Sequence, residues 1–182
     1  TRSDRDWSSD VCSSDLNGDA LEFASNNLKN NKKIVLSAVK QDGELIKFAS
    51  KKLKEDKDII IAVLKKSEDL TIIPGKFAND KKIIKMILKY LLVETNDYQA
   101  LNNKIKNNKT ITFAAIQNSA YNLEYAPKKF KNNKKIVLTA VKQDGSALQY
   151  TDKKLKADKE IVLEAVKQSG SALQYADKKL KA

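Results

Sequence analysis

The stretch LQYTDKKLKADKEIVLEAVKQSGS, Leu148–Ser171, is one copy of a unit that recurs about every 25 residues along the chain. A period of roughly 20–50 residues is typical of repeat proteins, in which each unit packs on its neighbours. One unit of this length cannot bury its own apolar face, so the pattern predicts a stacked array. The other copies begin at Leu21, Ile46, Leu70, Tyr98, Leu123 and Leu173.

Each copy carries a start signal for a helix. Asp158 stands three residues before Ile161, where an Asx side chain can accept hydrogen bonds from the free N–H groups of a helix N-terminus. Apolar residues follow at Ile161, Val162, Ala165 and Val166, a spacing that forms one helical stripe. The same capping slot is filled in the other copies by Asn31, Asp56, Asp80, Asn108 and Asn133.

The end of this helix is predicted to fall at a glycine. Gly170, with Gly43 and Gly145 in the same slot, could supply the positive-φ residue at which helices commonly end. A shorter segment from Ala172 to Leu180 follows, and we interpret it as a short helix or a 3-10 turn. The sequence therefore predicts an all-α solenoid of about six and a half helix-turn-helix repeats.

The third copy, residues 70–97, departs from the pattern. Pro74 and Gly75 replace helix formers, which predicts a turn. The second helix of this copy is expected to extend from Lys81 to about Val93. A small residue recurs in four of the long helices and would let neighbours approach closely, with Val63 and Ile87 as the exceptions. We predict one array over residues 17–182 with an irregular third repeat. The small-residue slot holds Ala38, Ala115, Ala140 and Ala165.

Residues 1–16 differ in character from the rest. The run Asp6–Leu16, DWSSDVCSSDL, resembles the translation of a common short-read sequencing adapter. We interpret this tail as non-native, as one treats tags and fusion scars, the alternative being a native disordered tail rich in Ser and Asp. The chain stops at KKLKA in the middle of a repeat, so we expect a fragment truncated at both ends.

Composition limits the chemistry that the array could perform. Without the tail, which holds Cys12, Trp7, Arg2 and Arg5, the chain has no Cys, Trp, Arg or His, and 33 Lys stand against 19 Asp and Glu, a net charge of +14. Thiol, His–Cys zinc and Ser-His-Asp chemistry are therefore excluded, and the carboxylates are scattered on polar faces. We predict no enzyme, no cofactor and no metal site.

Two further features bear on where the chain would function. The lack of Cys fits a reducing compartment, and we expect the cytoplasm. The most apolar run, Ile83–Val93, contains Lys85 and Lys89 and is shorter than the ~20 apolar residues that a membrane span needs.

The consensus L-x-[FY]-A-x-x-x-L-K-x-[DN]-K-x-I-V-L-x-A-V-K-Q-x-G resembles repeats of the domain of unknown function 4116 family. The runs at 148–170, 21–43 and 123–145 carry the resemblance, which is good in four copies and poor in the third and fourth. It implies tandem helical repeats within larger proteins. No activity and no functional residue follow from it.

Lysines recur at fixed places in the repeat and favour a polyanion-binding alternative. One series consists of the paired lysines listed at the end of this paragraph. A second series precedes the long helices, beginning with Lys32 and Lys33 and including Lys134 and Lys135. Two such ladders could follow a phosphate backbone if no carboxylates interrupt them. An aromatic residue recurs at one position of the repeat and is expected to lie in the core. This aromatic slot holds Phe23, Phe48, Tyr125, Tyr150 and Tyr175. Single Lys76 and Lys104 lie between paired lysines, and the paired candidates are Lys51, Lys52, Lys128, Lys129, Lys153, Lys154, Lys178 and Lys179.

Our first interpretation is a non-catalytic scaffold that binds another protein. Nucleic acid or another polyanion is the alternative partner, and a regulatory or spacer region of a larger enzyme is a second alternative. Protein binding would require an exposed apolar patch. The irregular third repeat offers the candidates Ile72, Ile73, Tyr90, Leu91 and Leu92.

Overall fold

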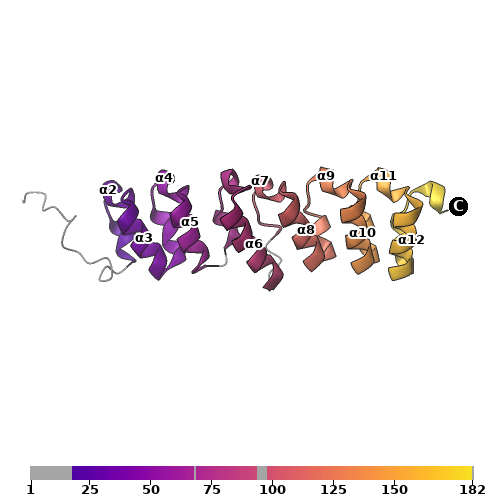
Figure 1. Ribbon diagram of the computed structural model, residues 1–182, viewed down its shortest axis with the longest axis horizontal. Coiled ribbons are helices and arrows are strands. Elements are labelled where there is room, and N and C mark those ends of the chain that lie inside the picture. The colour runs from indigo at the N-terminus through magenta and orange to yellow at the C-terminus, as the bar shows by residue number, and fades with distance from the viewer. Residues whose placement is uncertain (1–17, 68, 94–97, 182) are drawn as a thin grey trace, which may run out of the picture. The chain divides into compact units, whose positions relative to one another are not determined.

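The computed structural model describes residues 18–67, 69–93 and 98–181 (Figure 1). The adapter-like tail lies outside these residues. The chain divides into two compact units, Thr1–Ile72 and Ile73–Ala182, which are described separately below as unit 1 and unit 2. All regular structure in the described residues is helical, as the sequence predicts.

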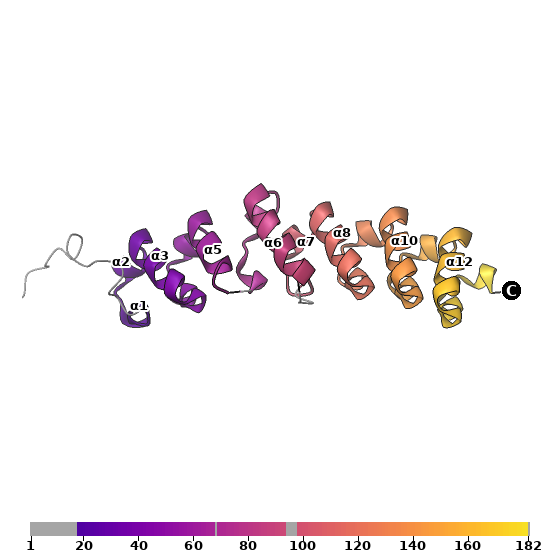
Figure 2. The same ribbon diagram turned by 60° about the horizontal axis from the view of Figure 1, so that its bottom comes forward.

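Unit 1 contains two complete long helices, and these pack against each other (Figures 1 and 2). Its elements in chain order are α1 (Ala20–Phe23), α2 (Asn26–Lys29), α3 (Lys32–Gln41), η1 (Gly43–Phe48), α4 (Lys51–Lys54), α5 (Lys57–Leu64) and η2 (Leu70–Ile72), where η marks a 3-10 helix.

Unit 2 contains four long helices, and each packs against the next along the chain. In Figure 1, α8, α10 and α12 succeed one another side by side, with the short helices α9 and α11 along one edge. Its elements are η3 (Gly75–Phe77), α6 (Lys81–Val93), α7 (Asn103–Lys106), α8 (Lys109–Asn118), η4 (Ala120–Leu123), α9 (Lys128–Lys131), α10 (Lys134–Gln143), η5 (Gly145–Tyr150), α11 (Lys153–Lys156), α12 (Lys159–Gln168), η6 (Gly170–Tyr175) and η7 (Lys178–Leu180).

A regular repeat consists of three helical pieces. A six-residue 3-10 helix is followed by an α-helix of one turn and then by the long α-helix. Thr151 and Asp152, with ψ of 158° and 149°, are extended and separate the first two pieces. The short segment of the repeat is thus a 3-10 helix followed by a one-turn α-helix here, whereas in the last copy, residues 172–180, both pieces are 3-10 helices, η6 and η7.

The predicted N-caps are confirmed in all six long helices. The Asp158 side chain accepts hydrogen bonds from the main-chain N–H groups of Glu160 and Ile161, at 3.0 and 3.3 Å. Such a cap contributes about 1 kcal/mol to helix stability. Equivalent bonds are made by Asn31, Asp56, Asp80, Asn108 and Asn133.

The core of unit 2 lies between successive long helices and 3-10 helices. Ile136, Val137, Ile161 and Leu148 are all buried in it. Because every long helix contributes one apolar stripe, each repeat buries its stripe on the next one. The small-residue slot is buried as well, and it holds Ala38, Ala115, Ala140 and Ala165.

The prediction that glycines end the helices through positive φ is wrong. No described glycine has a positive φ, and Gly145 instead begins η5. A Cβ on Gly145 would overlap the main-chain oxygen of Ala165 in the next repeat. Glycine is therefore required at this position by a close backbone approach, whereas a Cβ on Gly170 would meet open space.

The irregular third repeat follows its predictions. A short 3-10 turn, η3, begins directly after Pro74, and α6 extends over Lys81–Val93. Leu91, near the end of α6, is buried.

Main-chain hydrogen bonds also link neighbouring repeats. The N–H of Asp152 donates to the carbonyl of Lys131 at 3.0 Å, and the N–H of Ser50 donates to the carbonyl of Lys29 at 2.9 Å. Pro127 occupies this slot in repeat five and has no N–H to donate. There the Lys129 ammonium donates to the carbonyl of Asn107 at 2.9 Å and joins the two repeats.

Candidate interaction surface

Three tyrosines of unit 2 come together beside one carboxylate, and we call Tyr121, Glu124, Tyr125 and Tyr150 the tyrosine surface. Tyr121 belongs to η4 and Tyr150 to the next 3-10 helix, η5, so two successive repeats build it. Tyr121 is 45% exposed, and the other members are partly exposed. Tyr121 is the second residue of η4, Glu124 and Tyr125 directly follow η4, and Tyr150 is the last residue of η5.

The rings of the tyrosine surface meet edge to face. The Tyr121 centroid lies 5.5 Å from that of Tyr125, with 75° between the planes, and 5.8 Å from that of Tyr150, with 82°. The Tyr121 and Tyr125 hydroxyls are hydrogen-bonded at 2.9 Å. Such aromatic pairs contribute about 0.5–1.5 kcal/mol beyond burial of their area, so the arrangement is preorganised.

Glu124 makes the local environment of these rings electronegative. The hydrogen bond with Tyr125 and the neighbouring Glu124 carboxylate raise the pKa of Tyr121. Partial burial and then the Glu124 charge raise the pKa of Tyr150. Both effects disfavour a second negative charge, which is how a carboxylate beside a phenol acts. The tyrosine surface is thus a locally negative site in a strongly cationic chain.

The expectation that the recurrent aromatic slot is core is therefore wrong. Tyr150 and Tyr175 pack against the core of unit 2 but remain partly exposed, and Phe23 of unit 1 is 86% exposed. The buried positions of the 3-10 helix are Ala147 and Leu148. The aromatic residue two positions after Leu148 consequently lies at the edge of the core.

The candidate patch in the irregular repeat is not an exposed apolar surface. Ile73 and Leu91 are 2% and 1% exposed, and Ile72 and Tyr90 are partly buried. The side chain of Leu92 lies outside what the structure describes. Ile73 and Leu91 are buried because the apolar residues of this repeat pack inward. The prediction that these two residues form part of an exposed apolar patch is therefore wrong.

All eight lysines of the paired candidate ladder are exposed: Lys51, Lys52, Lys128, Lys129, Lys153, Lys154, Lys178 and Lys179. Their slot is variable within this chain, because Asn26, Asn27 and Asn103 occupy it in other repeats. Asp152 and Asp177 directly precede the lysine pairs of the last two copies. Their carboxylates accept hydrogen bonds from the main-chain N–H groups of Lys154 and Lys179.

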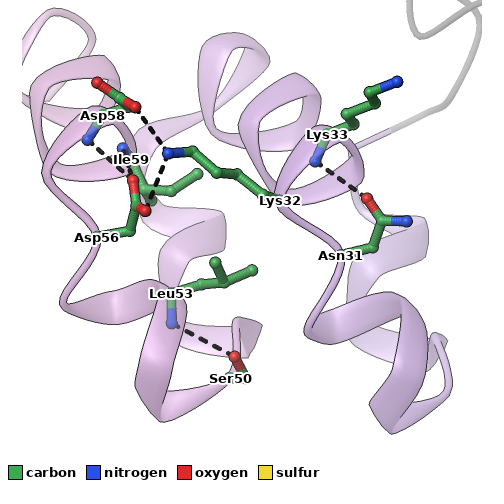
Figure 3. A network of polar contacts seen from close by, with 8 residues as sticks. All are labelled: Asn31, Lys32, Lys33, Ser50, Leu53, Asp56, Asp58 and Ile59. Carbon is green, nitrogen blue, oxygen red and sulfur yellow. Dashed lines mark hydrogen bonds and ion pairs between the residues drawn. The ribbon is translucent and has the colours of Figure 1, made fainter.

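Carboxylates interrupt the second lysine series. The Lys32 ammonium lies 2.9 Å from Asp56 and 2.6 Å from Asp58 (Figure 3). Lys134 makes the equivalent pairs with Asp158 and Glu160, at 2.8 and 2.7 Å. In both places the first lysine of a long helix bridges to the start of the next long helix. The two series therefore do not form one uniformly positive face.

A third set of lysines has a structural role that the sequence analysis missed. Lys156 of α11 donates from Nζ to the main-chain carbonyl of Gln149, in the preceding 3-10 helix, at 2.6 Å. Carbonyls at helix C-termini lack partners within the helix, so the ammonium satisfies one of them. We call this set the carbonyl-capping lysines: Lys29, Lys54, Lys106, Lys131, Lys156 and Lys181.

A signal for these lysines was present in the repeat. The one-turn helices read NNLK, KKLK, NKIK, KKFK and KKLK, so only the last lysine is constant among them. Partial burial lowers the pKa of Lys106 and of Lys156, since it disfavours the charged form. Part of the lysine excess is therefore explained by folding.

Repeat four also contains a buried polar cluster that the sequence did not reveal. The Tyr98 hydroxyl is hydrogen-bonded to Thr112 Oγ1 at 2.9 Å, and Thr112 Oγ1 donates to the carbonyl of Lys106 at 2.5 Å. Burial raises the pKa of Tyr98 to about 12. Thr112 occupies the slot that Val137 and Val162 fill in the regular repeats, so a hydrogen-bonded side chain replaces an apolar one at this position.

Within residues 18–67, 69–93 and 98–181, Asp and Glu do not gather in groups of three or more that could hold a metal ion. The helices in this part of the chain are all too short or too polar to cross a membrane.

The repeat architecture agrees with the family comparison. The family described as Domain of unknown function (DUF4116) matches residues 15–54, 31–72 and 133–181, which together cover more than half of the chain. These ranges leave out residues 73–132, which hold most of the third repeat, the fourth repeat and the first ten residues of the run at 123–145. No curated protein and no solved structure matches the chain. The chain belongs to the DUF4116 family of tandem helical repeats.

Proposed function

We propose that the chain is a non-catalytic helical-repeat scaffold that binds another protein through the tyrosine surface of unit 2. The observation that carries this proposal is the cluster of partly exposed rings at Tyr121, Tyr125 and Tyr150. Tyrosine is enriched in the energetically important centres of protein interfaces, because it offers a large apolar face and a polar tip at low entropic cost.

The preorganised geometry adds support. The edge-to-face contacts and the hydroxyl–hydroxyl hydrogen bond hold Tyr121 between two neighbours, although nearly half of it is exposed. A side chain that is already ordered loses less entropy when a partner binds. This arrangement favours a binding role over simple solvation of the surface.

Site-specific photo-crosslinking tests the proposal. A photoreactive phenylalanine analogue at position 121 should form an adduct with one protein in an extract of the source cells, and excess wild-type chain should compete for it. The Tyr121→Ser chain should not compete. The same analogue at position 23, which is also exposed, is the control. Equal adducts at both positions, or no competition by the wild-type chain, would contradict the proposal.

Polyanion binding is the second candidate, and the exposure of all eight paired lysines favours it. It is tested by fluorescence anisotropy of single- and double-stranded oligonucleotides across a salt series. Persistent binding at physiological salt with a steep salt slope would support it. Binding only at low salt would indicate general attraction of a cationic chain, as expected if carboxylates interrupt the second series.

A further inference from the structure

The aromatic rings of the chain are not all used in the same way. Lysine ammonium groups lie over several rings, at 5.1 Å from the centroid of Phe48 and 4.7 Å from that of Phe130. Within the described residues, no lysine lies in this manner over Tyr121, Tyr125 or Tyr150. Lys131, which follows Tyr125 by six residues, directs its ammonium to the main-chain carbonyl of Glu124 at 2.6 Å.

The tyrosine surface therefore offers a cation the two groups that bind one well. Aromatic faces attract cations through their quadrupole, and a neighbouring carboxylate adds a counter-charge. Guanidinium is the best match, because it is planar, weakly hydrated, stacks on aromatic rings and pairs with a carboxylate through two donors. Residues 17–182 contain no arginine of their own that could occupy the site.

We propose that the tyrosine surface binds an arginine side chain of a partner protein, with the guanidinium against the exposed part of the Tyr121 ring and paired with the Glu124 carboxylate. This inference rests on the proposed protein-binding role. Charge complementarity restricts the partner further. The lysine-rich remainder of the chain repels a polybasic segment, so the arginine lies in an otherwise neutral or acidic segment.

Selection from a random heptapeptide display library tests this inference with the full chain as target. Peptides that bind a folded Tyr121→Ser/Tyr150→Ser chain are first removed, which discards acidic sequences that bind the lysines. The remaining peptides are expected to contain a single arginine with neutral or acidic neighbours. Phe23→Ser is the matched control, because Phe23 is exposed and lies in unit 1. Far-UV circular dichroism verifies folding of each variant.

Anisotropy titrations of a selected peptide then measure the contribution of each group. Replacing its arginine by glutamine, or Glu124 by glutamine in the chain, should weaken binding about five-fold or more. Glu124→Gln preserves the shape of the side chain and keeps the test valid if the double tyrosine variant does not fold. Phe23→Ser should leave the dissociation constant unchanged.

The outcomes separate the two proposals. Tyrosine-dependent peptides without arginine, such as proline-rich sequences, would overturn the arginine inference and leave the protein-binding role standing. Binding that is insensitive to Glu124→Gln would also overturn the inference. A selection with no tyrosine-dependent peptides at all would overturn both.

Discussion

Unit 1 and unit 2 share the same polar contacts in their repeats but differ in the residues that fill the aromatic slot. In both, a lysine at the start of a long helix pairs with two carboxylates of the next repeat, Lys32 with Asp56 and Asp58 in unit 1. Within one repeat of each unit, a carbonyl-capping lysine, Lys54 or Lys156, satisfies a carbonyl of the preceding 3-10 helix. These polar contacts recur because every junction must solve the same packing problem.

The aromatic slot differs between the units. Phe48 of unit 1 has the Lys47 ammonium over its ring, whereas Tyr150 of unit 2 faces Tyr121. All six tyrosines of the chain lie in unit 2. The residues that repeat in both units thus maintain the fold, and the residues that differ are the ones to examine for binding. Because all tyrosines lie in unit 2, near-UV circular dichroism of tyrosine reports on unit 2 alone.

The largest expected effect concerns the glycine at the junction. Gly145→Ala should lower the free energy of unfolding of unit 2 by about 2–3 kcal/mol, because the added Cβ meets main-chain atoms of Ala165 and Ser169 that cannot rotate away. Gly43→Ala in unit 1 should cost less, since its Cβ would meet the side chains of Ser67 and Val63 at 3.0 and 3.3 Å.

Urea unfolding distinguishes these variants, with near-UV circular dichroism following unit 2 and far-UV circular dichroism following both units. Gly170→Ala is the control, because its Cβ would meet nothing within 4 Å. A change of no more than about 0.5 kcal/mol is expected for it. Equal losses for Gly145→Ala and Gly170→Ala would contradict a role for the close approach at Gly145.

The sequence predicted the fold well because the fold depends on local, repeated signals. The capping residues such as Asp158, the apolar stripe beginning at Ile161 and the turn at Pro74 each act within a few residues of chain. The role of Gly145 could not be predicted, because its constraint is contact with Ala165, 20 residues away. The recurrence of glycine at positions 43, 145 and 170 does not reveal whether φ or space requires it at any one of them.

The candidate surface was predicted less well. Exposure of Ile73 and Leu91 depends on what packs over them, and hydropathy alone does not reveal that. The proximity of Tyr121 to Tyr150 likewise arises from stacking of η4 on η5. The paired lysines are exposed, as the sequence indicates. The carboxylate and carbonyl partners of the other lysines could not be predicted. Those partners depend on atoms of the preceding 3-10 helix or the next repeat.

A smaller effect should separate the lysines of one helix. Lys156→Met should destabilise unit 2 by about 1–2 kcal/mol, because the carbonyl of Gln149 loses its donor while the apolar stem is kept. Lys154→Met is the control on the same helix, since its side chain is exposed. Urea unfolding followed by near-UV circular dichroism measures both.

Lys54→Met and Lys52→Met repeat this test in unit 1, with far-UV circular dichroism as the probe. Similar differences in the two units would support one shared junction design. A loss for Lys154→Met as large as that for Lys156→Met would contradict a specific role for the carbonyl-capping lysine and would indicate that any lysine on this helix is equivalent.

The smallest expected effect concerns the ion pairs between repeats. Asp158→Asn keeps an N-cap acceptor, as Asn133 does naturally, but loses the charge that pairs with Lys134. Because exposed pairs contribute little, the loss should stay below about 1 kcal/mol and shrink further in 1 M salt. Asp56→Asn is the equivalent change in unit 1.

The pH dependence gives this effect a sign. The hydrogen bond from Lys134 holds the pKa of Asp158 below its ordinary value near ~4. The pair therefore stabilises unit 2 above that pH, and the stabilisation is lost as pH falls through the lowered, folded-state pKa. Burial opposes the same shift at Asp56, where the hydrogen bond from Lys32 nevertheless keeps the pKa low.

The difference in unfolding free energy between wild type and Asp158→Asn should thus be constant near neutral pH and vanish in acid. A difference that persists below about pH 2 could not come from the charge. It would assign the effect to the geometry of the cap, and the ion pair would then contribute nothing measurable to the junction between repeats.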